Sequence, residues 1–188
     1  MQEQPFQTGD ALLVVDVQND FCPGGALAID EGDAVVPVLN EWIAAAERAE
    51  IPVFASRDWH PEGHCSFQEQ GGPWPVHCVQ ETPGAAFHPE LRLPKTADII
   101  SKGQSLETDQ YSALDGTGLT ETLREQGIGR LWIGGLAQDV CVHATVLDAL
   151  KAGFEVRLIS AATRAVDAQP GDGDRALREM REHGAELA

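Results

Sequence analysis

The chain's first apolar run is Ala11-Leu-Leu-Val-Val15, and it ends in the carboxylate of Asp16. Three later apolar runs also lead to a residue that can do chemistry: residues 51–57 precede Asp58, residues 97–101 precede Lys102, and residues 131–135 lead through a short turn to Cys141. Such runs, alternating with helical segments, are typical of a parallel sheet covered on both faces. Ligands bind these sheets outside the carboxyl ends of the strands. If the four runs are neighbours, their terminal residues meet in one crevice, which indicates an enzyme.

The segments between these runs continue the alternation of strand and helix. Residues 34–49 predict a helix with one apolar face, made of Val35, Val36, Leu39, Trp42, Ile43 and Ala46. We expect further helices at 118–126, after Asp139 and at 172–183, and further strands at 154–160 and 185–188. The fold class is therefore α/β, a three-layer αβα sandwich with a mainly parallel, Rossmann-like sheet. The length fits one domain, residues 1–188.

One long segment, residues 61–95, is proline-rich and shows no clean periodicity. We interpret it as an ordered loop, and loops of this length inside compact domains are usually functional.

The charge of the chain limits its partners. Asp and Glu number 30 against 13 Lys and Arg, which gives a formal net charge of −17. This balance argues against nucleic acid or an anionic membrane surface as a partner. No apolar stretch approaches a membrane span, and the polar start has no signal-peptide character. We therefore expect a cytoplasmic protein.

The four cysteines do not form a disulfide pattern, and none are spaced as a structural zinc site. We interpret Cys22, Cys65 and Cys78 as small apolar residues without a catalytic role. Cys141 differs because it follows Asp139, a plausible N-cap, and falls in the first turn of the helix expected there. In that position the helix dipole lowers a thiol pKa and favours the nucleophilic thiolate.

A second group of residues has the composition of a metal site. Asp58-Trp-His60 places two ligands at a strand end, and His77 follows in the long loop. One carboxylate and two histidines with open positions suit catalytic zinc, iron or manganese. The remaining histidines are interpreted as surface or capping residues: His64, His88, His143 and His183.

Several blocks of sequence together resemble the nicotinamidase/pyrazinamidase branch of the isochorismatase-like hydrolases. These blocks cover essentially the whole chain in the right order: Asp16-Val-Gln-Asn-Asp-Phe-Cys-Pro-Gly-Gly25, Arg57-Asp-Trp-His-Pro61, Gly72-Pro-Trp-Pro-Val-His-Cys-Val79, Thr82-Pro-Gly-Ala85, Lys102-Gly103, Tyr111-Ser-Ala113 and Asp139-Val-Cys141. The Trp-Pro-x-His-Cys block separates nicotinamidases from members of the family that hold no metal. A Gly or Ala in place of Cys141 would have indicated isochorismatase-type chemistry.

The resemblance implies a catalytic set. Cys141 would attack the carboxamide carbon of nicotinamide, and Asp16 would take the thiol proton and pass it to the departing ammonia. Lys102 would hold both charged groups and stabilise the thiolate. The family's oxyanion hole corresponds to the backbone N–H groups of Ala137 and Cys141, with a cis peptide bond between Leu136 and Ala137.

The resemblance also implies a metal and a pocket for the substrate. The family's ligands correspond to Asp58, His60 and His77, which would hold one divalent ion, zinc before iron or manganese. His64 follows His60 at a shorter spacing than the additional histidine of some members, so we leave it outside the ligand set. Phe21 and Trp74 would sandwich the pyridine ring, with Tyr111 near the pocket wall.

Alternatives to a nicotinamidase acting in NAD salvage remain open at this point. The nearest is an amidase of the same family that acts on another small aromatic or carbamoyl amide. An iron-dependent oxygenase would share the two histidines and the carboxylate but leaves Cys141 and Lys102 unexplained. A catalytically silent binding protein has no physical need for Asp16, Lys102 and Cys141 together. Members of the family often form dimers or tetramers, so the resemblance also points towards a homo-oligomer.

Overall fold

Six parallel strands form one sheet in the computed structural model, which describes residues 5–188. Their order across the sheet is β3-β2-β1-β4-β5-β6. The strands are β1 (Asp10–Val15), β2 (Val53–Asp58), β3 (Asp98–Lys102), β4 (Arg130–Leu136), β5 (Glu155–Arg164) and β6 (Glu186–Leu187). This is the doubly wound order, in which the sequence of strands reverses between β1 and β4. The reversal opens a crevice at the carboxyl ends of β1 and β4, where Asp16 and Cys141 follow their strands.

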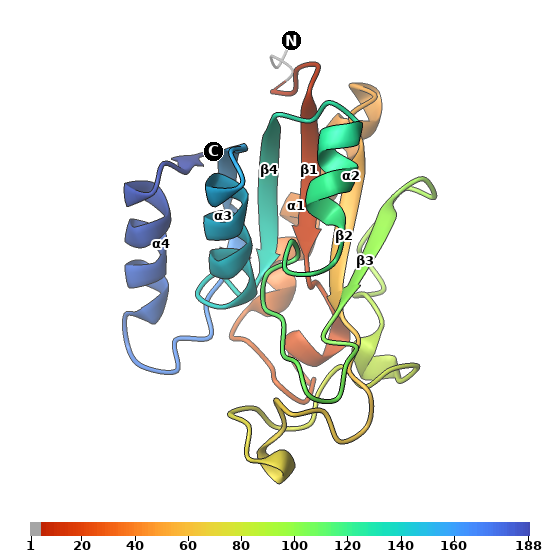
Figure 1. The fold of residues 1–188 in the computed structure, drawn as a ribbon, viewed down its shortest axis with the longest axis vertical. Helices are drawn as coiled ribbons and strands as arrows, with labels where there is room; N and C mark the ends of the chain where they lie inside the picture. The colour runs from red at the N-terminus through yellow and green to blue at the C-terminus, as the bar shows by residue number, and fades with distance from the viewer. Residues whose placement is uncertain (1–4) are drawn as a thin grey trace.

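Helices cover both faces of the sheet, which confirms the three-layer sandwich (Figure 1). Helix α1 (Val35–Arg48) lies behind the sheet, whereas α2 (Leu119–Glu125) and α3 (Cys141–Lys151) lie in front, with α4 (Asp172–Glu182) packed on α3. Alternate side chains of β1 point to opposite faces of the sheet and so contribute to the two hydrophobic cores on either side of it. Leu12 and Val14 pack with the α1 side, and Leu13 packs with the α2 and α3 side. Because both faces are buried, β1 is apolar from Ala11 to Val15.

Strand β5 extends beyond the predicted 154–160, because the register between β4 and β5 shifts between Ile133 and Gly135 and pairing then resumes. Gly135 has a φ of 131°, and a Cβ there would meet the carbonyl oxygen of Val15 at 2.0 Å. Only glycine allows this close approach of β4 to β1. Between these two pairs β4 advances by two residues and β5 by five, and such an irregularity interrupts the period-2 pattern on which a strand prediction rests. The other predicted helices and strands agree with the structure to within one or two residues.

The segment 61–95 is an ordered loop, as expected, with only two short 3-10 turns, η3 (Gln68–Gln70) and η4 (Pro83–Ala85). Figure 1 shows it in yellow and green at the end of the sheet where the strands terminate. Two more 3-10 turns, η1 (Asn19–Phe21) and η2 (Gly32–Ala34), follow β1. Among residues 5–188, no helix combines the length and apolar character needed to span a membrane.

Candidate active site and metal centre

Asp16, Lys102 and Cys141 meet at the carboxyl end of the sheet, although they come from β1, β3 and α3. The Lys102 Nζ atom lies 2.7 Å from Asp16 Oδ2 and 3.4 Å from Cys141 Sγ. Asp16 and Lys102 are completely buried, and Cys141 is 6% exposed. The structure therefore places a carboxylate, an ammonium group and a thiol in contact in a site from which bulk water is excluded.

The two oxygens of the Asp16 carboxylate have different surroundings. Oδ1 accepts a hydrogen bond of 2.7 Å from the Ser56 hydroxyl, which fixes the orientation of the group. Oδ2 forms an ion pair with the Lys102 ammonium, 2.7 Å from Nζ, and accepts no other hydrogen bond from residues 5–188. One lone pair of Asp16 is therefore available to accept a proton beside the thiol.

The resting thiol of Cys141 is not activated in the way the sequence suggested. Burial raises the pKa of Cys141 well above its usual range, Lys102 opposes this effect, and the charges of Asp16 and Asp58 reinforce it. The expected N-cap is also wrong, because α3 starts at Cys141 after Val140 and no side chain caps it. The thiol does lie in the first turn, but it needs a base rather than a helix dipole to become a thiolate.

A base is present beside the thiol. Burial raises the pKa of the Asp16 carboxyl, and the nearby charge of Asp58 adds to this, while Lys102 acts in the opposite direction. Burial alone would lower the pKa of the Lys102 ammonium, but its two carboxylate neighbours raise it well above its usual range. Lys102 is therefore a permanent cation between Asp16 and the thiol.

Asp58 connects this cluster to the histidines. Its Oδ1 accepts a hydrogen bond of 2.5 Å from Lys102, while its Oδ2 lies 3.6 Å from His60 Nε2 and 3.8 Å from His77 Nε2. Burial alone would raise the pKa of this carboxyl, but the ammonium of Lys102 and the two imidazoles hold it well below its usual range. Asp58 is therefore an anion whose two oxygens face different partners.

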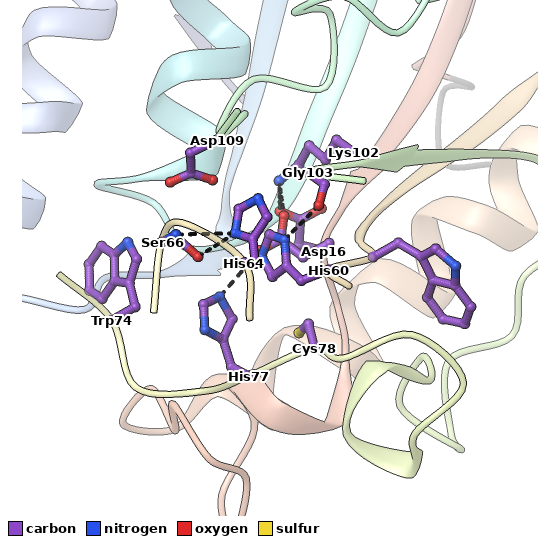
Figure 2. A network of polar contacts seen from close by, with 12 residues as sticks. Asp16, His60, His64, Ser66, Trp74, His77, Cys78, Lys102, Gly103 and Asp109 are labelled. Atoms are coloured by element: carbon purple, nitrogen blue, oxygen red, sulfur yellow. Dashed lines mark hydrogen bonds and ion pairs between the residues drawn. The ribbon is translucent and has the colours of Figure 1, made fainter. Parts of the chain in front are cut away.

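The three side chains Asp58, His60 and His77 fit a divalent metal. Their ligand atoms all lie within 4.8 Å of one another, and all three residues are buried. Each imidazole uses its other nitrogen on a backbone carbonyl: His60 Nδ1 lies 2.9 Å from the oxygen of Gly103, and His77 Nδ1 lies 2.8 Å from the oxygen of Pro75. With a proton on each Nδ1, both Nε2 atoms would offer a lone pair to a metal bound beside Asp58 Oδ2, which is the arrangement of protein metal sites. Figure 2 shows the histidines converging from their different loops.

His64 is not the surface or capping residue that its sequence context suggested. It is completely buried and stacks on His60, with 4.1 Å between the ring centroids (Figure 2). Its Nδ1 lies 2.7 Å from the Ser66 hydroxyl, and its Nε2 lies 3.1 Å from the Thr108 carbonyl oxygen. Because both ring nitrogens are engaged, His64 supports the His60 ring instead of pointing towards Asp58.

A pocket opens onto both clusters. The predicted aromatic residues Phe21, Trp74 and Tyr111 line it, and the Trp74 indole N–H donates a hydrogen bond of 3.1 Å to the Tyr111 hydroxyl. The pocket also contains Asp58, His60, His77, Ala137 and Cys141, together with Leu27, Ile29, Asp109 and Val166, which sequence reasoning did not assign. The peptide bond between Leu136 and Ala137 is cis, as the resemblance implied.

Gln18 is a second residue that sequence reasoning missed. Its buried amide accepts from the Asp58 backbone N–H at 2.8 Å and donates to the Asp58 carbonyl at 2.7 Å and to the Ala85 carbonyl at 2.8 Å. Gln18 therefore pairs with Asp58 as a strand would and holds its backbone in place. Its position two residues after Asp16 was the only sequence signal available.

Comparison with known proteins agrees with this geometry. A family model described as the isochorismatase domain matches residues 10–188. The chain belongs to the isochorismatase family. Within that family, it is 42% identical to the nicotinamidase of Escherichia coli (strain K12), over 94% of this chain and 93% of that protein.

Two solved structures of similar proteins show the same fold. The pyrazinamidase of Pyrococcus horikoshii in complex with zinc is 48% identical, with a TM-score of 0.92 over 96% of this chain and 98% of that chain. PnC1 from L. infantum in complex with nicotinate is 37% identical, with a TM-score of 0.88 over 96% of this chain and 92% of that one. This isochorismatase-family chain thus shares both its sequence and its architecture with enzymes named for amide hydrolysis.

Proposed function

We propose that this protein is a nicotinamidase that hydrolyses nicotinamide to nicotinate and ammonia, accepts pyrazinamide and serves NAD salvage. The observation that carries the proposal is one pocket that is lined by Cys141, the accessible member of the buried Asp16–Lys102–Cys141 cluster, and by all three residues of the Asp58–His60–His77 set. The nicotinamidase of E. coli and the nicotinate complex of the L. infantum protein support this substrate.

The first half of the reaction follows from the protonation states of the site. The raised pKa of Cys141 keeps the resting thiol neutral, so Asp16 removes its proton through the free lone pair of Oδ2 as the sulfur attacks the carboxamide carbon. The C–N bond then breaks, the proton passes from Asp16 to the leaving nitrogen, and ammonia departs. The acyl group remains on Cys141 as a thioester.

The second half repeats the same proton transfer with water. Asp16 takes a proton from a water molecule, whose oxygen attacks the thioester carbon. The C–S bond breaks, Asp16 returns the proton to the Cys141 sulfur, and the product leaves as a carboxylic acid that releases its remaining proton to solvent. Lys102 keeps its charge throughout, because two carboxylates raise its pKa, and it offsets the thiolate that forms 3.4 Å away.

We propose that the backbone N–H groups of Ala137 and Cys141 form the oxyanion hole. Both residues line the pocket, at the turn between β4 and α3. Donors held in this way stabilise the negative oxygen of each tetrahedral intermediate, and removing one such donor typically costs about 10²–10³ in kcat.

We propose that Asp58, His60 and His77 hold one divalent ion, zinc before iron or manganese. Bound there, it supplies an electrophilic position for a ring nitrogen of the substrate. Phe21 and Trp74 would flank the pyridine ring and Tyr111 would border it, each aromatic contact adding roughly 0.5–1.5 kcal/mol.

We place this activity in the cytoplasm, with a small molecule as substrate and no nucleic acid or membrane partner. The formal charge of −17 supports this, because it disfavours polyanions and anionic surfaces. Assembly into a homo-oligomer, which the family resemblance suggests, is a further part of this proposal.

The decisive experiment measures ammonia and nicotinate released from nicotinamide under anaerobic conditions, with metal content determined on the same sample. We expect stoichiometric products from the wild-type protein, less than a few per cent of that rate from Cys141→Ala, and near wild-type rates from Cys22→Ala, whose thiol lies in the hydrophobic core. A Cys141→Ala variant that keeps a substantial rate would refute the covalent mechanism. Oxygen-dependent turnover would favour the oxygenase, and hydrolysis of other amides only would favour the related amidase.

A further inference from the structure

Asp139 has an acidic side chain two residues before the nucleophile, but the chemistry derived above leaves it without a task. Its carboxylate reaches the connection between β5 and α4. Oδ1 accepts a hydrogen bond of 2.8 Å from the Val166 backbone N–H, and Oδ2 accepts one of 2.9 Å from the Asp167 backbone N–H. Both oxygens of Asp139 are therefore committed to one neighbouring segment rather than to Cys141 or the N-terminus of α3.

That segment carries part of the substrate pocket. Val166 lines the pocket together with Cys141, Trp74 and Val140. The next residue, Asp167, has a φ of 50°, a conformation that is uncommon for residues other than glycine. The local backbone does not favour this path by itself, so external contacts are needed to hold it. Asp139 supplies such contacts, because its carboxylate accepts hydrogen bonds from the backbone N–H groups of Val166 and Asp167.

A second set of contacts ties the same turn to the start of α4. The Gln138 amide donates to the Gly173 carbonyl at 2.9 Å, and the Gly173 N–H donates to Asp167 Oδ1 at 2.8 Å. Gly173 is also closely packed, since a Cβ there would lie 2.6 Å from the Cβ of Ala165. Hydrogen bonds thus join the turn before the nucleophile both to the segment that contains Val166 and to the start of α4.

We propose that Asp139 is a positioning residue that sets the pocket wall at Val166 and thereby limits the size of the aromatic amide the enzyme accepts. The proposal rests on the nicotinamidase function argued above. A carboxylate is required because it offers acceptors to two adjacent N–H groups. An asparagine has one acceptor oxygen, and its NH₂ group would face a second donor, so at least one of the two loop hydrogen bonds is lost.

The test compares Asp139→Asn with a matched control in the same connection. Asp172 Oδ2 accepts a hydrogen bond of 2.8 Å from the Gln169 N–H, so Asp172→Asn makes the same chemical change at a residue that does not line the pocket. The substrates are nicotinamide and 5-methylnicotinamide, which carries one additional methyl group on carbon 5 of the ring. Each variant is also examined by amide hydrogen exchange at residues 166 and 167, a measurement that needs no turnover.

For Asp139→Asn we expect KM for nicotinamide to rise about tenfold, with kcat within about threefold of wild type. The specificity constant for the methylated amide, relative to that for nicotinamide, should rise about tenfold, and exchange at 166 and 167 should accelerate. Asp172→Asn should change the kinetic parameters less than twofold. Val166→Ala should reproduce the change in selectivity, and adding it to Asp139→Asn should change selectivity little further, because both act on the same wall.

Several results would overturn the proposal. A fall in kcat with unchanged KM and unchanged selectivity would show that Asp139 acts on the nucleophile instead. Full additivity with Val166→Ala, or unchanged exchange at 166 and 167, would show that it does not hold this wall. A wild-type protein that does not hydrolyse nicotinamide would refute the proposed function, whereas the exchange measurement would still judge the structural role of Asp139.

Discussion

Replacing Lys102 by methionine should destabilise the protein strongly, as well as inactivate it. The substitution keeps the apolar stem of the side chain and removes its charge, which lies 2.7 Å from Asp16 and 2.5 Å from Asp58 in a completely buried site. Removing one partner of a buried ion pair typically costs about 3–5 kcal/mol, because the remaining charge is left without compensation. Here two carboxylates lose their shared cation. In a chain of this length each kcal/mol lowers Tm by roughly 2–4 °C, so we expect a decrease of about 6–20 °C.

The pH dependence of this destabilisation has a definite sign. In the wild-type protein the folded-state pKa of Asp58 is lowered below its unfolded value, so its contribution to stability is present above the unfolded pKa and is lost as the pH falls through the folded one. Lys102→Met removes the main attraction that lowers this pKa. Without Lys102, Asp16 and Asp58 lose the attraction that favours their charged forms, so the folded variant takes up protons at a higher pH than the wild type and relieves the uncompensated charge. The difference in unfolding free energy between variant and wild type should therefore be large at pH 7 and shrink as the pH approaches 4.

The assay is urea unfolding of metal-free protein at pH 7 and pH 4, followed by circular dichroism. The matched control is Lys151→Met, at the exposed C-terminal end of α3, for which we expect a change within about 0.5 kcal/mol. A Lys102→Met variant as stable as Lys151→Met at pH 7, or one whose deficit grows towards pH 4, would refute the account of a buried cation that neutralises two carboxylates.

Three other predictions follow from the site and the sheet. Removing the metal with a chelator should weaken substrate binding, and adding zinc, iron or manganese should restore it. His77→Ala should lower metal occupancy strongly and His64→Ala weakly. Equal losses of metal in the two variants would place His64 among the ligands. Benzamide should have a kcat/KM at least ~10²-fold below that for nicotinamide, because it lacks the ring nitrogen that orients the carboxamide. Comparable values for the two amides would mean that the metal does not bind the ring nitrogen. Asp10→Asn should cost about 1–3 kcal/mol at pH 7, because Asp10 accepts hydrogen bonds from Arg130 and Trp132. Burial alone would raise the pKa of Asp10, but these donors lower it, so the deficit should shrink as the pH falls below about 4 towards the lowered folded pKa; a deficit that stays constant over that range would contradict this account.

The two clusters of the site are joined by one side chain. Asp58 presents Oδ1 to Lys102 and Oδ2 to the histidines, and Gln18 holds the backbone of Asp58 on both sides. A substitution at Asp58 therefore changes the metal centre and the surroundings of the nucleophile together. Variants of His77 disturb the metal centre with less effect on Lys102, which makes them the better probes of the metal's own contribution.

The sequence by itself determined the architecture and the residue types that meet in the site. Continuous apolar runs predicted strands buried on both faces, and residues at the ends of parallel strands share one edge of the sheet whatever their separation in sequence. Asp16, Lys102 and Cys141 could therefore be expected together if the runs that precede them were neighbouring strands, and the strand order of the structure meets that condition. The boundaries of most helices and strands also agreed, because their periodicity depends on local spacing.

The tertiary structure decided what depends on burial and on contacts between distant segments. The pKa of Cys141 is raised rather than lowered, because burial of the thiol sets the direction of the shift, and a position in a helix does not reveal burial. His64 proved to be buried against His60, and Asp139 binds Val166 and Asp167 instead of capping α3. Gln18 and Asp58 are 40 residues apart, so no periodic pattern links them. Such pairings exist only once the chain has folded, because packing brings the partners together and removes the water that would otherwise satisfy them.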